Sequence, residues 1–154
     1  PLSYHNGSVW PHDVAIIAMG FSKYGLKEEV LQLTNGLFDA SLFIELQRLP
    51  ELFCGLERRP GEGPTDYPVA CSPQAWSVGA VYMLLQACLG IEIVAKEKIL
   101  KFNNPVMPKG VKKIHIEPLV LGEKHVAIDV QNKKGHIQIK IPDLPKDWQM
   151  QIFK

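Results

Sequence analysis

The sequence predicts a mainly α-helical region followed by a small antiparallel β-sheet. Three segments within the first 90 residues have the apolar spacing of helices, whereas apolar residues alternate with other residues after residue 105. The charge also changes, because residues 1–90 carry 5 basic and 9 acidic side chains while residues 91–154 carry 12 and 7. We therefore expect a helical domain over residues 1–95, a linker over residues 96–108 and a β-sheet over residues 109–154.

The first helix is predicted over residues 11–24. Pro11 suits the first turn of a helix, where its missing N–H group would have no partner, and Asp13 complements the helix dipole. Residues 14–19 are apolar on every side of this helix, which ends near Gly25. A helix that is apolar all round needs neighbours on every side. We therefore expect that part of the helical domain is missing from this chain.

Two further helices are predicted over residues 26–47 and 73–89. In the first, apolar residues recur every three or four positions, and Pro50 ends the segment. In the second, Ser72 is the expected N-cap, Pro73 fills the first helical position and Gly90 ends the helix. The expected packing face of this helix is marked by Trp76, Ala80, Leu84 and Ala87.

The rest of the chain divides into a long loop and four predicted strands. Residues 51–71 are rich in proline and glycine, and long ordered loops of this kind are often functional. Strands are expected at 111–121, 124–131, 136–141 and 148–153, with a turn at 133–135.

Composition and charge exclude several classes of protein. With 46% apolar and 21% charged residues, the 154-residue chain is too apolar for a disordered protein. Its net charge of +1 gives no reason to expect binding to nucleic acid or to a membrane. The longest apolar run, residues 14–21, is shorter than the about 20 residues of a spanning helix. Three cysteines without a Cys-x-x-Cys pair favour free thiols in the cytoplasm.

Three stretches carry side chains that could perform chemistry. Residues 4–13 combine aromatic rings that can stack on sugars with polar groups that can bind hydroxyls, although a plain helix-capping region is the alternative. Glu51 lies between apolar neighbours, where the pKa of a carboxyl is raised and the group is a candidate acid or base. A solvent-facing loop carboxylate is the alternative there. Gln74 and Trp76 could line a pocket, or Trp76 could be a core residue.

No cofactor and no metal site is predicted. His115, His125 and His136 fall on different predicted strands, so the sequence shows no compact ligand set. Cys54 and Cys71 have no evident histidine partner that would make either a nucleophile. Neither a GxGxxG fingerprint nor a P-loop is present.

Together these stretches resemble the C-terminal part of the catalytic domain of the amylo-α-1,6-glucosidase (glycogen debranching enzyme) family. The motifs are YHNGSVWPHD at 4–13, RLPELFCG at 48–55 and YPVACSPQAW at 67–76, and the resemblance covers residues 3–95. The tail resembles, more loosely, the small β appendage of bacterial members. The resemblance implies an (α/α)6 toroid of the six-hairpin glycosidase type, with the helix at 11–24 as an inner helix. It further implies that the chain is the C-terminal fragment of a longer enzyme.

The chemistry implied by the resemblance is hydrolysis of α-1,6-glucosidic branches of glycogen-like glucans with inversion. Inverting enzymes place two carboxyl groups about 6.5–9.5 Å apart, one as general acid and one as general base. Glu51 matches the family's base, and the acid is expected upstream of this chain, which would leave the isolated chain inactive. The partners would be the glucan and the upstream part of the enzyme. Substrate-binding roles are implied for Asn6, Trp10, His12, Asp13, Gln74 and Trp76.

Two other functions stay open. A carbohydrate-binding or regulatory module could retain the cleft without catalysis, and weak glucan binding by a cooperatively folding chain would favour it. A molten or aggregating chain would favour the incomplete enzyme, because half a toroid exposes large apolar faces. The basic C-terminal part could bind a polyanion, but its lysines are interleaved with acidic residues, as on a solvated strand surface.

Overall fold

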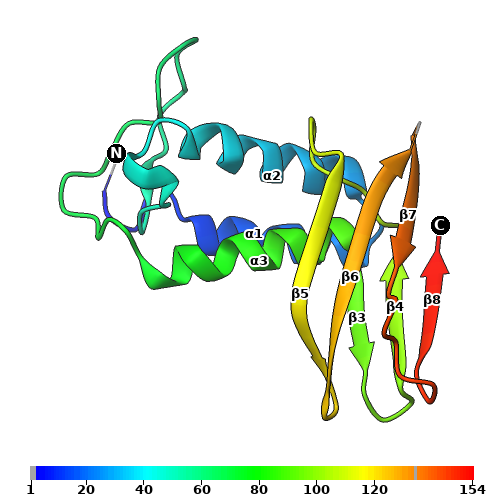
Figure 1. Cartoon of the computed structure of the whole chain (residues 1–154). Helices are drawn as coiled ribbons and strands as arrows, with labels where there is room; N and C mark the ends of the chain where they lie inside the picture. The colour runs from blue at the N-terminus through cyan, green and yellow to red at the C-terminus, as the bar shows by residue number, and fades with distance from the viewer. Residues whose placement is uncertain (1–2, 134) are drawn as a thin grey trace. The chain divides into compact units, whose positions relative to one another are not determined.

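The computed structural model describes residues 3–133 and 135–154, and these form a mixed α and β structure (Figure 1). About 30% of these described residues are helical, in three α-helices, and about 28% are in strands, in three sheets. The prediction of a mainly α fold and of an (α/α)6 toroid is therefore wrong, because the three described helices cannot close a ring of helical hairpins. The error arises partly at residues 91–103, where a β-hairpin occupies the expected end of the helical domain and the first part of the linker.

The chain divides into two units, one ending at Ala87 and the other comprising Cys88–Lys154. The division falls within the third helix, whereas the sequence suggested residue 95. Residues 96–108, the expected linker, include strand β4 (Ile99–Asn103), which pairs with β3 (Ile91–Val94). The second unit therefore contains more strands than the sequence indicated.

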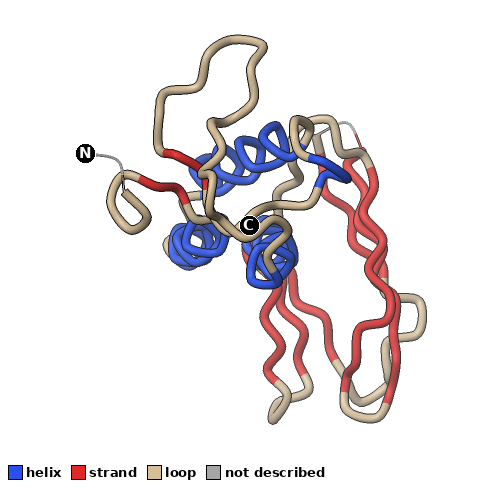
Figure 2. Tube along the Cα trace, turned by 90° about the vertical axis from the view of Figure 1, so that its left-hand side faces the viewer, coloured by secondary structure: helices blue, strands red, loops and turns tan. Residues whose placement is uncertain are grey.

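The first unit contains α1 (Pro11–Lys23), α2 (Lys27–Ser41) and most of α3 (Ala75–Leu89), which lie side by side (Figure 1, Figure 2). Helix α1 begins at Pro11 as predicted, but it is not buried on most faces. Ala15 and Ala18 are fully buried, whereas Ile16 and Ile17 are 58% and 50% exposed. Since only one face of α1 is buried against the described residues, the prediction of an inner helix is wrong as well.

Helix α2 ends at Ser41, before the predicted end at residue 47. A single 3-10 turn, η1 (Glu45–Gln47), follows, and in it Leu46 and Gln47 have φ angles of 53° and 56°. Two L-residues in the left-handed region cannot continue a right-handed helix. The apolar spacing hid this break, because Ile44 still fits the helical period.

A buried lysine connects the ends of the helices. Lys27 Nζ donates to Ser22 Oγ at 2.8 Å and to the Ala87 carbonyl oxygen at 2.7 Å. Substitution of Lys27 by Met keeps much of the side-chain volume but removes the charge and its donors. We expect the free energy of unfolding to fall by about 2 kcal/mol, measured by chemical denaturation. Lys23→Met, at an exposed lysine of α1, is the control, and an equal loss there would contradict the assignment.

The second unit consists of two three-stranded sheets that face each other (Figure 1, Figure 2). One contains β3, β4 and β8 (Gln149–Phe153), and the other contains β5 (Lys113–Leu121), β6 (Lys124–Lys133) and β7 (His136–Lys140). The sequence predicted β5 to β8 close to these positions. It did not predict β3 and β4, nor that β8 pairs with β4 in parallel.

Alternating side chains place one face of β6 in the core of the second unit. Val126, Ile128 and Val130 are all buried, as the alternation predicted.

Gly90 ends α3 as expected, with φ of 61°, and a Cβ there would lie 2.1 Å from the carbonyl oxygen of Asn103. The predicted turn at 133–135 includes Lys134, which lies outside the described residues.

The exposed face of the β5–β6 pair carries a charged network. His115 Nδ1 lies 3.1 Å from Asp129 Oδ1, and its Nε2 lies 3.1 Å from Glu117 Oε2. The Glu117 and Asp129 carboxylates raise the pKa of His115 above its usual 6.5. Protonated His115 therefore stabilises the fold. Its contribution to the unfolding free energy is complete below pH about 6.5 and is lost as the pH rises through the raised pKa.

We therefore expect the melting temperature to fall as the pH rises from 6 through the raised pKa of His115. The comparison is made with a variant that keeps every other titrating group. His115→Gln removes the ionisable ring and is expected to flatten this part of the profile. Exposed His125→Gln is the control. If the His115 variant keeps the same pH dependence as the unsubstituted chain, the network does not stabilise the sheet.

Candidate functional site

Glu51 is held in place by the segment that precedes α3. The backbone N–H of Glu51 donates to the Cys71 carbonyl oxygen at 2.8 Å, and the Cys71 N–H donates to Glu51 Oε2 at 3.1 Å. Next to this pair, Ser77 Oγ donates to the Pro50 carbonyl oxygen at 2.6 Å, and the Gln74 N–H donates to the Leu49 carbonyl oxygen at 3.3 Å. Three of these hydrogen bonds hold the backbone of residues 49–51 on residues 71–77, and the fourth orients the half-buried Glu51 side chain.

The N-terminal segment supplies the second partner of Glu51. Strand β1 (Ser8–Val9) pairs with β2 (Phe53–Cys54), and the Gly55 N–H donates to the Gly7 carbonyl oxygen at 2.7 Å. This pairing places the segment beside Glu51, where the Tyr4 hydroxyl donates a short hydrogen bond to Glu51 Oε1. The two residues are 47 positions apart in the sequence.

Hydrogen bonding keeps the Glu51 carboxyl ionised. The Tyr4 hydroxyl and then the Cys71 N–H lower the pKa of Glu51, and the Gln74 side chain lowers it further. The carboxylate in turn raises the pKa of Tyr4 to about 12, so the shared proton stays on the tyrosine. The raised pKa that the apolar neighbours of Glu51 suggested is therefore wrong, because donors aimed at the carboxylate outweigh its desolvation.

A row of aromatic rings extends from Tyr4. The centroid distances are 5.0 Å from Tyr4 to Trp10, 5.5 Å from Trp10 to His12 and 4.9 Å from His12 to Trp76, each pair edge to face. We call Tyr4, Trp10, His12 and Trp76 the aromatic row. The Trp76 ring is 69% exposed, which excludes the core role considered for it and leaves a flat apolar surface open to solvent.

A cleft of about 470 Å³ lies at the Trp76 end of the aromatic row. His12, Asp13 and Trp76 line it, together with apolar side chains of α1 and α3. His12 Nε2 is 3.9 Å from Asp13 Oδ1, while His12 Nδ1 is buried and has no hydrogen-bond partner among the described residues. A buried ring nitrogen without a partner is uncommon in folded proteins, and a hydroxyl group of a ligand would satisfy it.

The structure brings most of the predicted site residues together. Gln74 lies against Glu51, and Trp10, His12, Asp13 and Trp76 belong to the aromatic row or the adjoining cleft. Asn6 is the exception, because its recorded hydrogen bonds involve only its backbone, with Ser3. Sequence reasoning did not assign Tyr4 a bond to Glu51, and its place at the start of the first motif was the only available signal.

Tyr4→Phe tests the electrostatics of this pair. Removing the hydroxyl takes away the largest cause of the lowered Glu51 pKa, so we expect the pKa to rise. Any activity that needs ionised Glu51 would then be lost at a higher pH as the solution is acidified. NMR titration of the Glu51 carboxyl carbon measures the shift. Tyr67→Phe is the control, since Tyr67 contacts the Tyr4 ring, and an equal rise there would contradict the Tyr4 assignment.

The described residues include no group of three or more His, Cys, Asp or Glu side chains placed to hold a metal ion. Within that same part of the chain, no helix has the length and apolar character needed to cross a membrane. Comparison with protein-family models finds no match to this chain, and comparison with curated proteins finds none either.

Proposed function

We propose that this chain supplies the general base and part of the sugar-binding surface of a glycoside hydrolase. The enzyme cleaves α-1,6-glucosidic branches of glycogen-like glucans with inversion, and Glu51 is the base. The observation that carries the proposal is an ionised Glu51 that accepts hydrogen bonds from Tyr4 and Cys71 at one end of the aromatic row. The motif resemblance at residues 4–13, 48–55 and 67–76 supplies the reaction class.

The geometry suits a base better than an acid. A carboxylate has about four acceptor positions. Tyr4 and the Cys71 N–H use one on each Glu51 oxygen, and the Gln74 side chain also donates to the carboxyl. The remaining positions can accept a proton from a water molecule. That water attacks the anomeric carbon while a second carboxyl group protonates the departing glycosidic oxygen.

The aromatic row and cleft provide the sugar-binding surface. The exposed Trp76 ring offers a flat face for a sugar ring, and His12 and Asp13 offer polar atoms to its hydroxyls. Gln74 contacts Glu51 and is proposed to orient it. Asn6 is also proposed to contact the substrate, and this role rests only on the motif resemblance at residues 4–13.

The general acid is proposed to come from residues upstream of this chain, as the family resemblance implies. Asp13, which lines the cleft, and Asp66, on the loop after β2, are the candidates within the chain. The proposal places the enzyme in the cytoplasm, because the reducing conditions there suit the three free cysteines.

A non-catalytic carbohydrate-binding module is the second candidate. The exposed Trp76 and the unpartnered His12 nitrogen favour it, because both can serve sugar binding without proton transfer. The two functions differ in the role of Glu51. The enzyme needs it for turnover, whereas in a binding module it contributes to binding at most.

Glucose release from a branched limit dextrin tests the proposal. The chain is assayed alone and together with the upstream part of the enzyme, and NMR identifies the anomer first released. We expect no release from the chain alone and β-glucose from the assembled enzyme. Release of α-glucose would exclude inversion, and glucose from the isolated chain would make Asp13 or Asp66 the acid. Glucan binding without release by the assembly would establish the binding module instead.

A further inference from the structure

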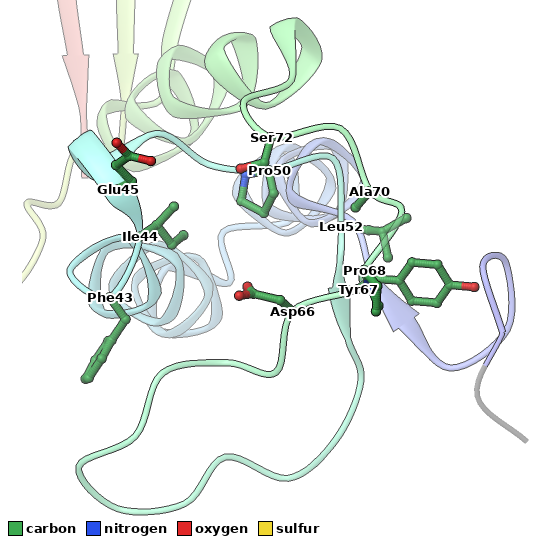
Figure 3. Close-up of a pocket in the computed structure, with 10 residues that line it drawn as sticks. All are labelled: Phe43, Ile44, Glu45, Pro50, Leu52, Asp66, Tyr67, Pro68, Ala70 and Ser72. Carbon is green, nitrogen blue, oxygen red and sulfur yellow. The ribbon is translucent and has the colours of Figure 1, made fainter.

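A second pocket lies beside Glu51 and is separate from the cleft at Trp76. It has a volume of about 400 Å³, within the range of small-molecule sites, and lies between the end of α2 and the loop after β2 (Figure 3). Pro50 and Leu52 line it, so the residues on either side of Glu51 form one of its walls. Tyr67 also lines it and contacts the Tyr4 ring at 5.9 Å.

The pocket combines carboxylate groups with apolar surfaces. Glu45 and Asp66 enter its lining from different segments of the chain (Figure 3). Within the part of the chain that the structure describes, neither side chain has a recorded hydrogen bond or ion pair. Phe43, Pro50 and Leu52 supply apolar surface between them. The acceptor positions of both carboxylates are therefore available to a ligand.

This combination fits a neutral sugar. Vicinal hydroxyls can donate charge-assisted hydrogen bonds to a carboxylate, while the C–H faces of the ring pack on apolar side chains. A divalent cation fits less well, because calcium takes about 6–8 oxygen ligands and the described residues hold no cluster of three candidate ligands here.

We propose that this pocket, the Asp66 pocket, binds a glucose unit of the α-glucan next to the unit at Glu51. The inference rests on the proposed function, which supplies the glucan. The wall formed by Pro50 and Leu52 and the shared Tyr67 join the two sites. A substrate chain that occupies both would contact the segment that carries the base, and Asp66 would accept a hydrogen bond from a sugar hydroxyl.

NMR titration of the full chain with maltohexaose tests this inference. The backbone amides of Ala70 and Ser72 report the Asp66 pocket, and the indole N–H of Trp76 reports the cleft. We expect both sets of signals to shift. Asp66→Asn is expected to weaken binding at the pocket by about fivefold, because a neutral acceptor replaces a charged one, and to leave the Trp76 response unchanged. Asp39→Asn, at an exposed carboxylate of α2, is the matched control.

The outcomes separate this inference from the proposed function. Shifts at Trp76 alone would overturn the Asp66 pocket and leave the proposed function standing. Shifts at the pocket alone would support the pocket as a sugar site and count against the cleft. Pocket shifts that Asp66→Asn leaves unchanged would overturn the inference. So would pocket shifts produced by spermidine and not by maltohexaose, since they would identify a cation site.

Discussion

Substitution of Glu51 by Gln is expected, under the proposed function, to lower the turnover of the assembled enzyme by roughly 10²–10⁴-fold, the usual contribution of a general base. The glutamine amide oxygen can still accept a hydrogen bond from Tyr4, but it cannot take a proton from water. The side chains have nearly the same shape, so the segment joined to Cys71 is expected to stay in place. Glucan binding, measured by tryptophan fluorescence, should therefore be spared.

Glu57→Gln provides the matched control for this measurement. Glu57 is an exposed carboxylate on the loop after β2, and the same chemical change there is expected to leave turnover unaltered. If Glu51→Gln keeps its turnover, the base assignment fails. If turnover and glucan binding are lost together while the chain still melts cooperatively, Glu51 acts in binding rather than in proton transfer.

Gly55→Ala is expected to change both the stability of the chain and the charge state of Glu51. A Cβ at Gly55 would lie 2.3 Å from the Gly7 carbonyl oxygen, and this atom belongs to the backbone and cannot rotate away. The N-terminal segment would have to shift, at a cost of about 1–3 kcal/mol in unfolding free energy. Because the same segment carries Tyr4, the Tyr4–Glu51 hydrogen bond would weaken and the pKa of Glu51 would rise.

Chemical denaturation and NMR titration of Glu51 measure these two consequences together. Gly36→Ala in α2 is the control, because a Cβ there meets nothing within 4 Å. Alanine is the better helix former, so the control is expected to stabilise the chain by about 0.5–1 kcal/mol. A Gly55 variant with unchanged stability and an unchanged Glu51 pKa would show that the close approach to Gly7 does not position Tyr4.

Local sequence patterns identified Glu51 as a candidate residue but did not predict its charge state correctly. Glu51 was singled out by its apolar neighbours, yet the pKa direction inferred from those neighbours was the opposite of the one its hydrogen bonds produce. The donors come from Tyr4 and Cys71, which are 47 and 20 positions away. Residues that distant from a carboxyl leave no trace in its local pattern, so only the paired strands β1 and β2 and the segment before α3 reveal the charge state.

The Asp66 pocket was hidden from the sequence for the same reason. Its lining combines residues 43–45 after α2, Pro50 and Leu52 beside Glu51, and residues 66–72 on the following loop. Taken separately, each of these stretches was predicted as a helix end or a loop, and none indicated a pocket. Their convergence depends on where α2 stops, which is at Ser41 and earlier than the apolar spacing suggested.

Local sequence signals correctly predicted the start of α1 at Pro11, the end of α3 at Gly90, and the alternating core face of β6. Capping, glycine conformation and side-chain period depend on residues within a few positions of one another. Three features became visible only in the folded chain: the fold is mixed, β8 pairs with β4 in parallel, and Tyr4 reaches Glu51. These features arise from contacts between distant segments, whose energies no local pattern contains.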